Sequence, residues 1–296
     1  MTEIIASLAT LSGRYDAVLC DLWGCLHNGK APFPAAVAAL QKYRAAGGKV
    51  VLLTNAPRPK SSVAAQLDSM GCPRDVWDEI VTSGDAAQYA MLAGAVGRKV
   101  AFIGADKDES FFTDFTEDLA EFAASQPLIV RVPMAEATGI VCTGLAHDLT
   151  ETPANYHAAL LMAKTLGLQM LCANPDLMVD YGDKRLYCAG ALAAEYEKIG
   201  GTALYFGKPH PPIYDLASRR LGALGLGKDA QILCIGDGIG TDVQGGMSEG
   251  LDTLFVTGGL AADQFGADIE SPDPKLLLAW LDEKMMSATF AIGQLR

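Results

Sequence analysis

Several features of specialised protein classes are missing from this sequence. Its seven cysteines include no CxxC pair, and no cluster stands out among the 23 Lys and Arg residues. No apolar run approaches the ~18 residues of a membrane span, and Met1–Arg14 lacks the basic start of a secretory leader. Zinc sites, disulfide scaffolds, nucleic-acid partners and membrane partners are therefore not expected, and we expect buried free thiols in a cytoplasmic protein.

The composition that remains is that of a globular protein. Half of the 296 residues are apolar, a fifth are charged, and the net charge is −12. At about 150 residues per domain, this length predicts two domains or one domain with a large insertion. The sequence leaves open whether copies associate into a homo-oligomer.

Short apolar runs alternate with helix-period segments, which favours parallel sheets with crossover helices. Towards the two ends, the expected strands are Asp16–Leu22, Lys49–Thr54, Ala203–Phe206, Gln231–Ile235 and Leu251–Val256, with helices at Pro34–Ala46, Ser61–Met70 and Pro211–Leu224. In the middle, the expected strands are Lys99–Ile103, Pro127–Val132, Gly139–Cys142 and Gln169–Cys172, with helices near Lys107–Ala124 and Thr152–Leu166.

This pattern predicts an α/β protein built on a Rossmann-like, doubly wound parallel sheet. Residues 1–82 and 184–296 are expected to form that core, and residues 83–183 an inserted α/β cap domain. In such open sheets, ligands bind at the carboxyl ends of the strands. Polar residues directly after a predicted strand are therefore the first candidates for a site.

Acidic residues follow two of the predicted strands. Asp21 ends the first strand before a Gly-containing turn, and Asp237 and Asp242 lie on the loop after Gln231–Ile235. Converging carboxylates would suit a hard cation such as Mg²⁺. Each acid taken alone can equally cap a turn or a helix.

Two further segments could bind an anion. Lys208 stands between Gly207 and Pro209 after a short predicted strand, and Thr54 and Asn55 end the second strand. A lysine stabilises a phosphoryl group as a point charge, and a hydroxyl or an amide can hydrogen-bond it. A lone lysine or a Thr-Asn pair also occurs without any such role.

The order of these segments resembles the four motifs of the haloacid dehalogenase superfamily of aspartate-nucleophile phosphohydrolases. An insertion between the second and third motifs resembles its class IIA members, such as the N-acetylglucosamine-phosphate, phosphoglycolate and nucleotide phosphatases. Their pattern also recurs in Val81–Ala87, in Cys172–Asp176 and in Ala189–Leu192. The resemblance extends over roughly Ala17 to Gly259.

The resemblance implies a role for each candidate. Asp21 would be the nucleophile that forms an aspartyl-phosphate. Mg²⁺ would be held by Asp21, the backbone carbonyl of Trp23, Asp237 and Asp242. Thr54, Asn55 and the catalytic Lys208 would bind the phosphoryl group, and Asn174 and Asp176 would contact the substrate from the cap.

The sequence departs from the family at Trp23, where the phosphatases have a second aspartate that serves as general acid and base. The indole cannot carry that proton. Either His27 supplies it, or the substrate has a good leaving group, or the protein binds a phosphorylated ligand with little or no turnover.

We therefore expect a Mg²⁺-dependent phosphohydrolase that acts on a small phosphorylated metabolite. One alternative is a non-catalytic or weakly active phospho-ligand-binding relative. Another is a metal-independent dehalogenase, because an aromatic residue at the position of Trp23 also resembles that branch. Against it, both acids of a Mg²⁺ site are retained in Asp237 and Asp242.

Overall fold

A computed structural model describes residues 2–181 and 184–296, and it divides into two compact units. The first unit comprises residues 1–54, 64–81 and 214–296, and the second comprises residues 55–63 and 82–213. No helix in the described part of the chain is long and apolar enough to cross a membrane. All seven cysteines are buried and free, as the sequence predicted.

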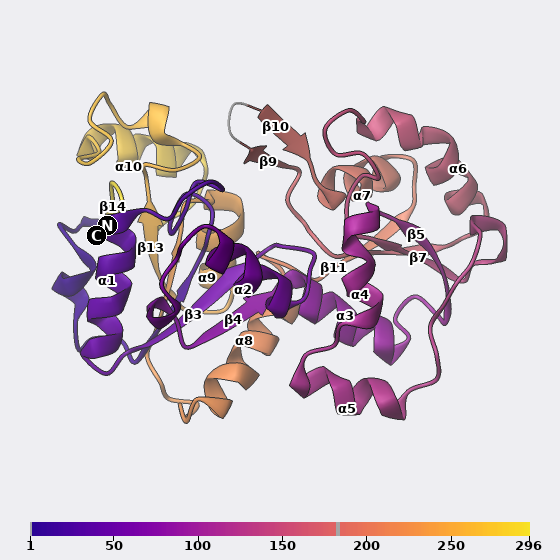
Figure 1. Cartoon of the computed structure of the whole chain (residues 1–296). Coiled ribbons are helices and arrows are strands. Elements are labelled where there is room, and N and C mark those ends of the chain that lie inside the picture. Colours follow the sequence, from indigo (N-terminus) through magenta and orange to yellow (C-terminus); the bar gives the residue numbers. More distant parts are fainter. Residues whose placement is uncertain (1, 182–183) are drawn as a thin grey trace. The chain divides into compact units, whose positions relative to one another are not determined.

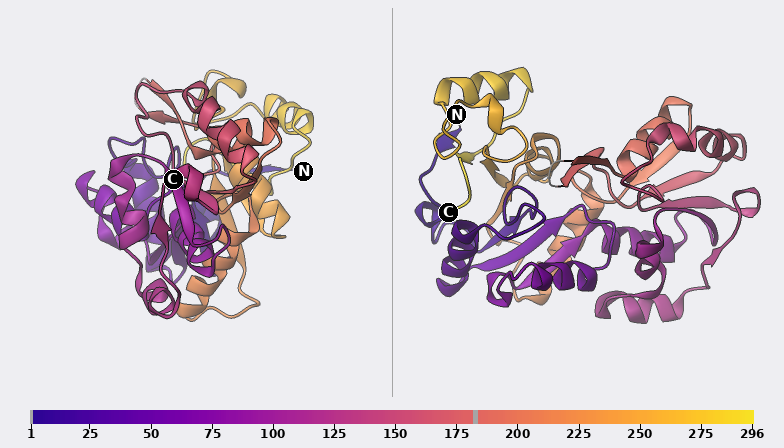
Figure 2. Two further views of the ribbon diagram at one scale, coloured as in Figure 1. Left: turned by 90° about the vertical axis from the view of Figure 1, so that its right-hand side faces the viewer. Right: turned by 45° about the horizontal axis from the view of Figure 1, so that its top comes forward.

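The first unit is built on a seven-stranded sheet in the order β1-β14-β13-β12-β2-β3-β4. Its strands are β1 (Glu3–Ile4), β2 (Ala17–Cys20), β3 (Lys49–Thr54), β4 (Glu79–Thr82), β12 (Ile232–Gly236), β13 (Asp252–Val256) and β14 (Phe290–Ile292). The pair of β2 with β12 is parallel, as are β2 with β3 and β12 with β13. Both ends of the chain lie in this unit, where β1 pairs with β14 (Figure 2). The predicted doubly wound parallel sheet is confirmed.

Helices connect these strands. They are α1 (Pro34–Ala45), α2 (Lys60–Ser69), α8 (Pro211–Ala223), α9 (Gln244–Ser248) and α10 (Pro274–Glu283), with shorter turns η1 (Leu8–Leu11), η2 (Arg74–Val76), η6 (Ile239–Val243) and η7 (Ala262–Gln264). Pro34 begins α1 because proline has the backbone φ of a first helical residue and needs no N–H partner there. The helix α10 packs on the sheet through a buried cluster that includes its own Leu277 and Leu281 and Phe255 of β13.

The second unit has its own parallel sheet, in the order β11-β8-β7-β5-β6 (Figure 1). The strands are β5 (Lys99–Ile103), β6 (Val130–Arg131), β7 (Gly139–Cys142), β8 (Gln169–Cys172) and β11 (Thr202–Tyr205), and β9 (Met178–Tyr181) and β10 (Lys184–Tyr187) form an antiparallel pair. The helices are α3 (Ser83–Ala93), α4 (Ser110–Thr113), α5 (Glu117–Ser125), α6 (His157–Thr165) and α7 (Ala189–Lys198), and the turns are η3 (Asp106–Glu109), η4 (Met134–Glu136) and η5 (Pro153–Tyr156). Its core joins Tyr196 and Leu192 of α7 to Met170 and Ile140 of the sheet.

Three differences from the sequence interpretation concern this unit. Residues 55–63, which were predicted in the core, group with it. The strand expected at Ala203–Phe206 exists as β11, but it pairs with β8 in the second sheet, and residues 184–213 group with the second unit. The predicted domain limit at residue 183 lies outside the described residues. The helix expected at Lys107–Ala124 is broken, because Asp114 is extended and the Gln88 side chain binds the carbonyl oxygens of Phe111 and Asp114.

Candidate active site

The first unit brings Asp21 and Asp237 together at the point where the order of its sheet reverses. From β2 the chain continues to β3 and β4 on one side, whereas β12 to β14 lie on the other side of β2. The carboxyl ends of β2 and β12 therefore flank the place where open α/β sheets bind ligands. Asp21 directly follows β2, and its N–H donates to the carbonyl of Ile235 in β12 at 2.8 Å. Asp237 directly follows β12.

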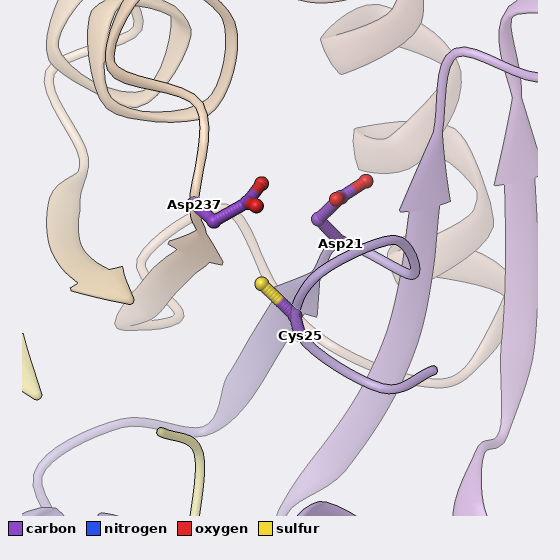
Figure 3. A group of neighbouring side chains, drawn as sticks. All are labelled: Asp21, Cys25 and Asp237. Atoms are coloured by element: carbon purple, nitrogen blue, oxygen red, sulfur yellow. The ribbon is translucent and has the colours of Figure 1, made fainter. Parts of the chain in front are cut away.

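These two aspartates form a compact group with Cys25. One ligand atom of each of the three residues lies within 4.8 Å of the others, and Figure 3 shows the three side chains as neighbours beside the ends of their strands. Asp21 and Asp237 are only 7% and 5% exposed. Two buried carboxylates at this separation repel each other unless a positive charge lies between or beside them. The arrangement can hold a divalent cation.

Glycines provide the space that Asp237 occupies. A Cβ atom on Gly24 or on Gly259 would lie 2.0 Å from Asp237 Oδ2. The N–H of Leu260 donates to the same oxygen at 2.9 Å. Gly24 also has φ +72°, which side chains other than glycine rarely adopt. Both glycines are thus required by the position of the carboxylate.

Cys25 was not among the predicted site residues. Burial, and then the charges of Asp237 and Asp21, raise the pKa of its thiol well above the ordinary value. The thiol is therefore protonated beside the two carboxylates, and sulfur is a soft donor that hard cations do not favour. The donor atoms that remain are oxygens, which Mg²⁺ and Ca²⁺ prefer. Nothing in the sequence marked Cys25 as a site residue, because a lone buried cysteine is usually a packing residue.

Asp242 lies outside this three-residue group in the described part of the chain. It belongs to η6, a short π-helical turn, and its Oδ2 accepts hydrogen bonds from Gly238 N–H at 3.2 Å and Thr241 Oγ1 at 3.1 Å. A Cβ on Gly236 would lie 2.1 Å from the Asp242 side chain. Asp242 thus braces the loop that carries Asp237, and its role as a metal ligand stays a prediction.

Trp23 and His27 pack against each other in the loop after Asp21. Their rings meet edge to face at 5.2 Å between centroids. A Cβ on Gly29 would lie 2.2 Å from the indole, so the ring rests on that glycine. The Trp23 side chain is consequently held in place by its own loop.

His27 is a neutral, buried ring. It is 2% exposed, and burial lowers its pKa to about 4. Its Nδ1 accepts the N–H of Gly29 at 3.0 Å, which leaves the single ring proton on Nε2. A neutral imidazole is a very weak acid, so at neutral pH it cannot donate the proton that the missing aspartate would supply. The structure therefore favours a packing role for His27 over the role of substitute acid.

Thr54 ends β3, the strand next to β2, and is 4% exposed. This placement follows from the sequence, since Lys49–Thr54 is the strand that was predicted. Thr54 completes the set of predicted residues at the carboxyl edge of the first sheet.

The other predicted residues lie in the second unit, where Asn55, Asp176 and Lys208 are in contact. Asn55 Nδ2 donates to Asp176 Oδ1 at 2.8 Å, and Asn55 Oδ1 accepts the N–H of Lys208 at 2.7 Å. Asn174 Oδ1 accepts the N–H of Asp176 at 3.0 Å and so forms the turn that presents this aspartate. Asn174 and Asp176 follow β8, and Lys208 follows β11, its neighbour in the sheet.

The Val81–Ala87 segment has an architectural role. Asp85 Oδ1 accepts the N–H of Lys60 at the start of α2, and Thr82 Oγ1 accepts the N–H of Asp85. Ser83 Oγ bonds the carbonyl oxygen of Ala173 at 2.5 Å. A Cβ on Gly84 would lie 2.4 Å from the backbone nitrogen of Arg58. These contacts hold the loops on either side of Asn55 and Asn174.

Comparisons with known proteins identify the family of this chain. A sequence model described as haloacid dehalogenase-like hydrolase matches residues 18–116, and one described as HAD-hydrolase-like matches residues 205–281. A solved haloacid dehalogenase-like family hydrolase from Brucella suis 1330 is 37% identical with a TM-score of 0.83, and the match covers 99% of this chain and all of that one. This chain belongs to the haloacid dehalogenase-like hydrolases.

Several relatives of this chain have named activities. The D-glycerol 3-phosphate phosphatase of Mycobacterium tuberculosis is 29% identical over 86% of this chain, which spans 66% of that relative's length. A solved glycerol phosphate phosphatase from the same organism, in complex with magnesium, is 26% identical with a TM-score of 0.62 over 89% of this chain and 74% of that chain. Both are named as phosphatases, the reaction class that the resemblance implied.

Proposed function

We propose that this chain is a Mg²⁺-dependent phosphatase that hydrolyses a small phosphorylated metabolite through an aspartyl-phosphate on Asp21. The observation that carries the proposal is the pair of buried carboxylates, Asp21 and Asp237, side by side where the sheet order reverses. The named phosphatase relatives support the reaction class, and a magnesium complex of one of them supports a divalent cation.

In this proposal a carboxylate oxygen of Asp21 attacks the phosphorus atom of the substrate. The bond from phosphorus to the ester oxygen breaks, and the released oxygen takes a proton. Water then hydrolyses the aspartyl-phosphate to give back Asp21 and inorganic phosphate. Asp21, the Trp23 carbonyl, Asp237 and Asp242 would hold Mg²⁺, which when bound neutralises charge on the phosphoryl group.

Residues outside the carboxylate pair bind and select the substrate. Thr54 and Lys208 bind the phosphoryl group, through a hydroxyl and a point charge. Asn174 and Asp176 contact the rest of the substrate, so the inserted segment, predicted as residues 83–183, carries selectivity. Asn55 was predicted as a further phosphoryl ligand.

Because Trp23 stands in the place of a general acid, it limits which substrates are hydrolysed quickly. A general acid contributes roughly 10²–10⁴ to the rate, and an indole cannot provide it. Because His27 is neutral and packed against Trp23, the leaving oxygen takes its proton from water. Substrates with good leaving groups are therefore favoured over alkyl esters.

The same feature favours a second candidate, a protein that binds a phosphorylated ligand with little or no turnover. A screen of p-nitrophenyl phosphate, glycerol phosphate and nucleoside monophosphates, with and without Mg²⁺, separates the two. We expect Mg²⁺-dependent turnover that Asp21→Asn abolishes and that Asp263→Asn, the same change at an exposed position, leaves intact. Binding without turnover would support the second candidate, and metal-independent turnover of haloacids would support a dehalogenase.

A further inference from the structure

The side chain of Asn55 joins two segments that are far from it in the sequence. Its Oδ1 accepts the N–H of Lys208 at 2.7 Å, and its Nδ2 donates to the carbonyl oxygen of the same residue at 3.0 Å. Nδ2 also donates to Asp176 Oδ1 at 2.8 Å. Asn55 thus binds the backbone N–H and the backbone carbonyl of one residue, Lys208, through the two ends of its amide, and one carboxylate through its second N–H.

These contacts occupy both N–H groups of the side-chain amide. A carboxamide has two N–H groups, and in Asn55 one is directed to Lys208 and the other to Asp176. Asn55 is 4% exposed, so these bonds are shielded from solvent. Neither N–H of the Asn55 side chain is left for a phosphoryl oxygen.

The packing around Asn55 leaves it little freedom. A Cβ on Gly207 would lie 2.4 Å from Asn55 Oδ1 and 2.6 Å from Pro175 Cδ. A Cβ on Gly190 would lie 2.1 Å from the carbonyl oxygen of Pro175. The loops that carry Asp176 and Lys208 therefore approach each other closely, with the Asn55 amide between them.

We propose that Asn55 is a positioning residue that fixes Lys208 and Asp176 relative to each other, and that its side chain does not itself bind the phosphoryl group. The inference rests on the proposed roles of Lys208 in phosphoryl binding and Asp176 in substrate selection. Through this one amide, the position of the phosphoryl-binding lysine depends on that of the substrate-selecting aspartate.

An exchange of the two side chains tests this. Asn55→Asp keeps the size of the side chain and the acceptor for Lys208 N–H, but it removes both donors and sets a second carboxylate beside Asp176. We expect kcat/KM to fall about 10- to 100-fold, the range for losing a hydrogen bond to a charged group. Adding Asp176→Asn lets residue 176 donate an N–H to the carboxylate at residue 55, which restores the hydrogen bond in the reverse direction. The double variant should recover about 10-fold in kcat/KM.

Asn155→Asp is the matched control. Asn155 is exposed, and its Oδ1 accepts the N–H of Thr152, a contact that aspartate can keep. This variant should retain the kcat/KM and the thermal unfolding midpoint of the unmodified protein. Inhibition by inorganic phosphate, measured in parallel, should weaken in Asn55→Asp and return in the double variant.

A direct phosphoryl ligand would give a different result, since Asp176→Asn could not restore a contact between residue 55 and the substrate. Full activity in Asn55→Asp, or inhibition by inorganic phosphate that does not return in the double variant, would overturn the proposal. If the unmodified protein hydrolyses none of the phosphate esters, the proposed function fails, and the unfolding midpoints of the unmodified protein, Asn55→Asp, Asp176→Asn and the double variant decide the inference. Additive shifts would then contradict it. Should Asn55→Asp not fold, Asn55→Ala and Asp176→Ala form the cycle instead, and additivity again counts against the contact.

Discussion

The carboxylate pair in the first unit and the Asn55 cluster in the second obtain their geometry by different means. Asp237 fits between Gly24 and Gly259, so backbone without side chains fixes the place of a charge. Asp176 and Lys208 are fixed by the side chain of Asn55, which bonds to both. The first arrangement is encoded in short Gly-containing loops after strands, whereas the second depends on contacts across 121 and 153 residues of sequence.

Changes in the first region should act on the chemistry, and the largest effect is expected at Trp23. Trp23→Asp introduces the missing acid and base, and it should raise hydrolysis of alkyl phosphates by up to roughly 10²–10⁴. Hydrolysis of p-nitrophenyl phosphate, whose leaving group needs little protonation, should change far less. Steady-state kinetics on both substrates measures the difference.

His27→Ala in the unmodified protein is the companion measurement. It should lower stability, because a buried ring that packs against Trp23 is lost, and a folded variant should keep its leaving-group preference. Loss of all activity in a folded His27→Ala protein would identify His27 as the acid and contradict the account of Trp23.

The next largest effect is expected on Mg²⁺ binding, from a methyl group added at Gly259. Gly259→Ala places a Cβ against Asp237 Oδ2, and displacing a ligand in this way should weaken Mg²⁺ binding about 10- to 100-fold. Gly222→Ala is the control, because a Cβ on that glycine of α8 meets no atom within 4 Å. Equal Mg²⁺ affinities in the two variants would show that the glycine does not set the position of Asp237.

The corresponding change in the second region is Gly207→Ala, with a smaller expected effect. Its Cβ would press on Asn55 Oδ1 and Pro175, so KM for phosphate esters should rise several-fold, by about 1 kcal/mol of binding energy. Mg²⁺ affinity should stay that of the unmodified protein. A loss of Mg²⁺ affinity as large as that of Gly259→Ala would break the distinction between the two regions.

The sequence predicted the parts of this protein that depend on local pattern. Lys49–Thr54 and Gln169–Cys172 were predicted as strands with the bounds they have, because each is a short apolar run between turn signals. Asp21 and Asp237 were predicted to converge because both follow such strands. The neighbouring Cys25 was missed, since one buried cysteine looks like any other packing residue.

What the sequence could not predict depends on pairing between distant segments. β11 is four residues long, and nothing within Thr202–Tyr205 says which of two parallel sheets it joins. The amide of Asn55 was predicted to bind phosphate because a Thr-Asn pair after a strand suits an anion. Only the contacts with Asp176 and Lys208 show where its N–H groups are directed.

The central claim is that Asp21 and Asp237 hold a divalent cation on which phosphate hydrolysis depends. Titration calorimetry of Mg²⁺ into the unmodified protein and into Asp237→Asn tests it most directly. The account predicts one bound Mg²⁺ per chain in the unmodified protein, and weaker binding together with reduced Mg²⁺-dependent activity in a folded Asp237→Asn protein. Unchanged Mg²⁺ affinity in the Asp237→Asn protein would contradict the metal site.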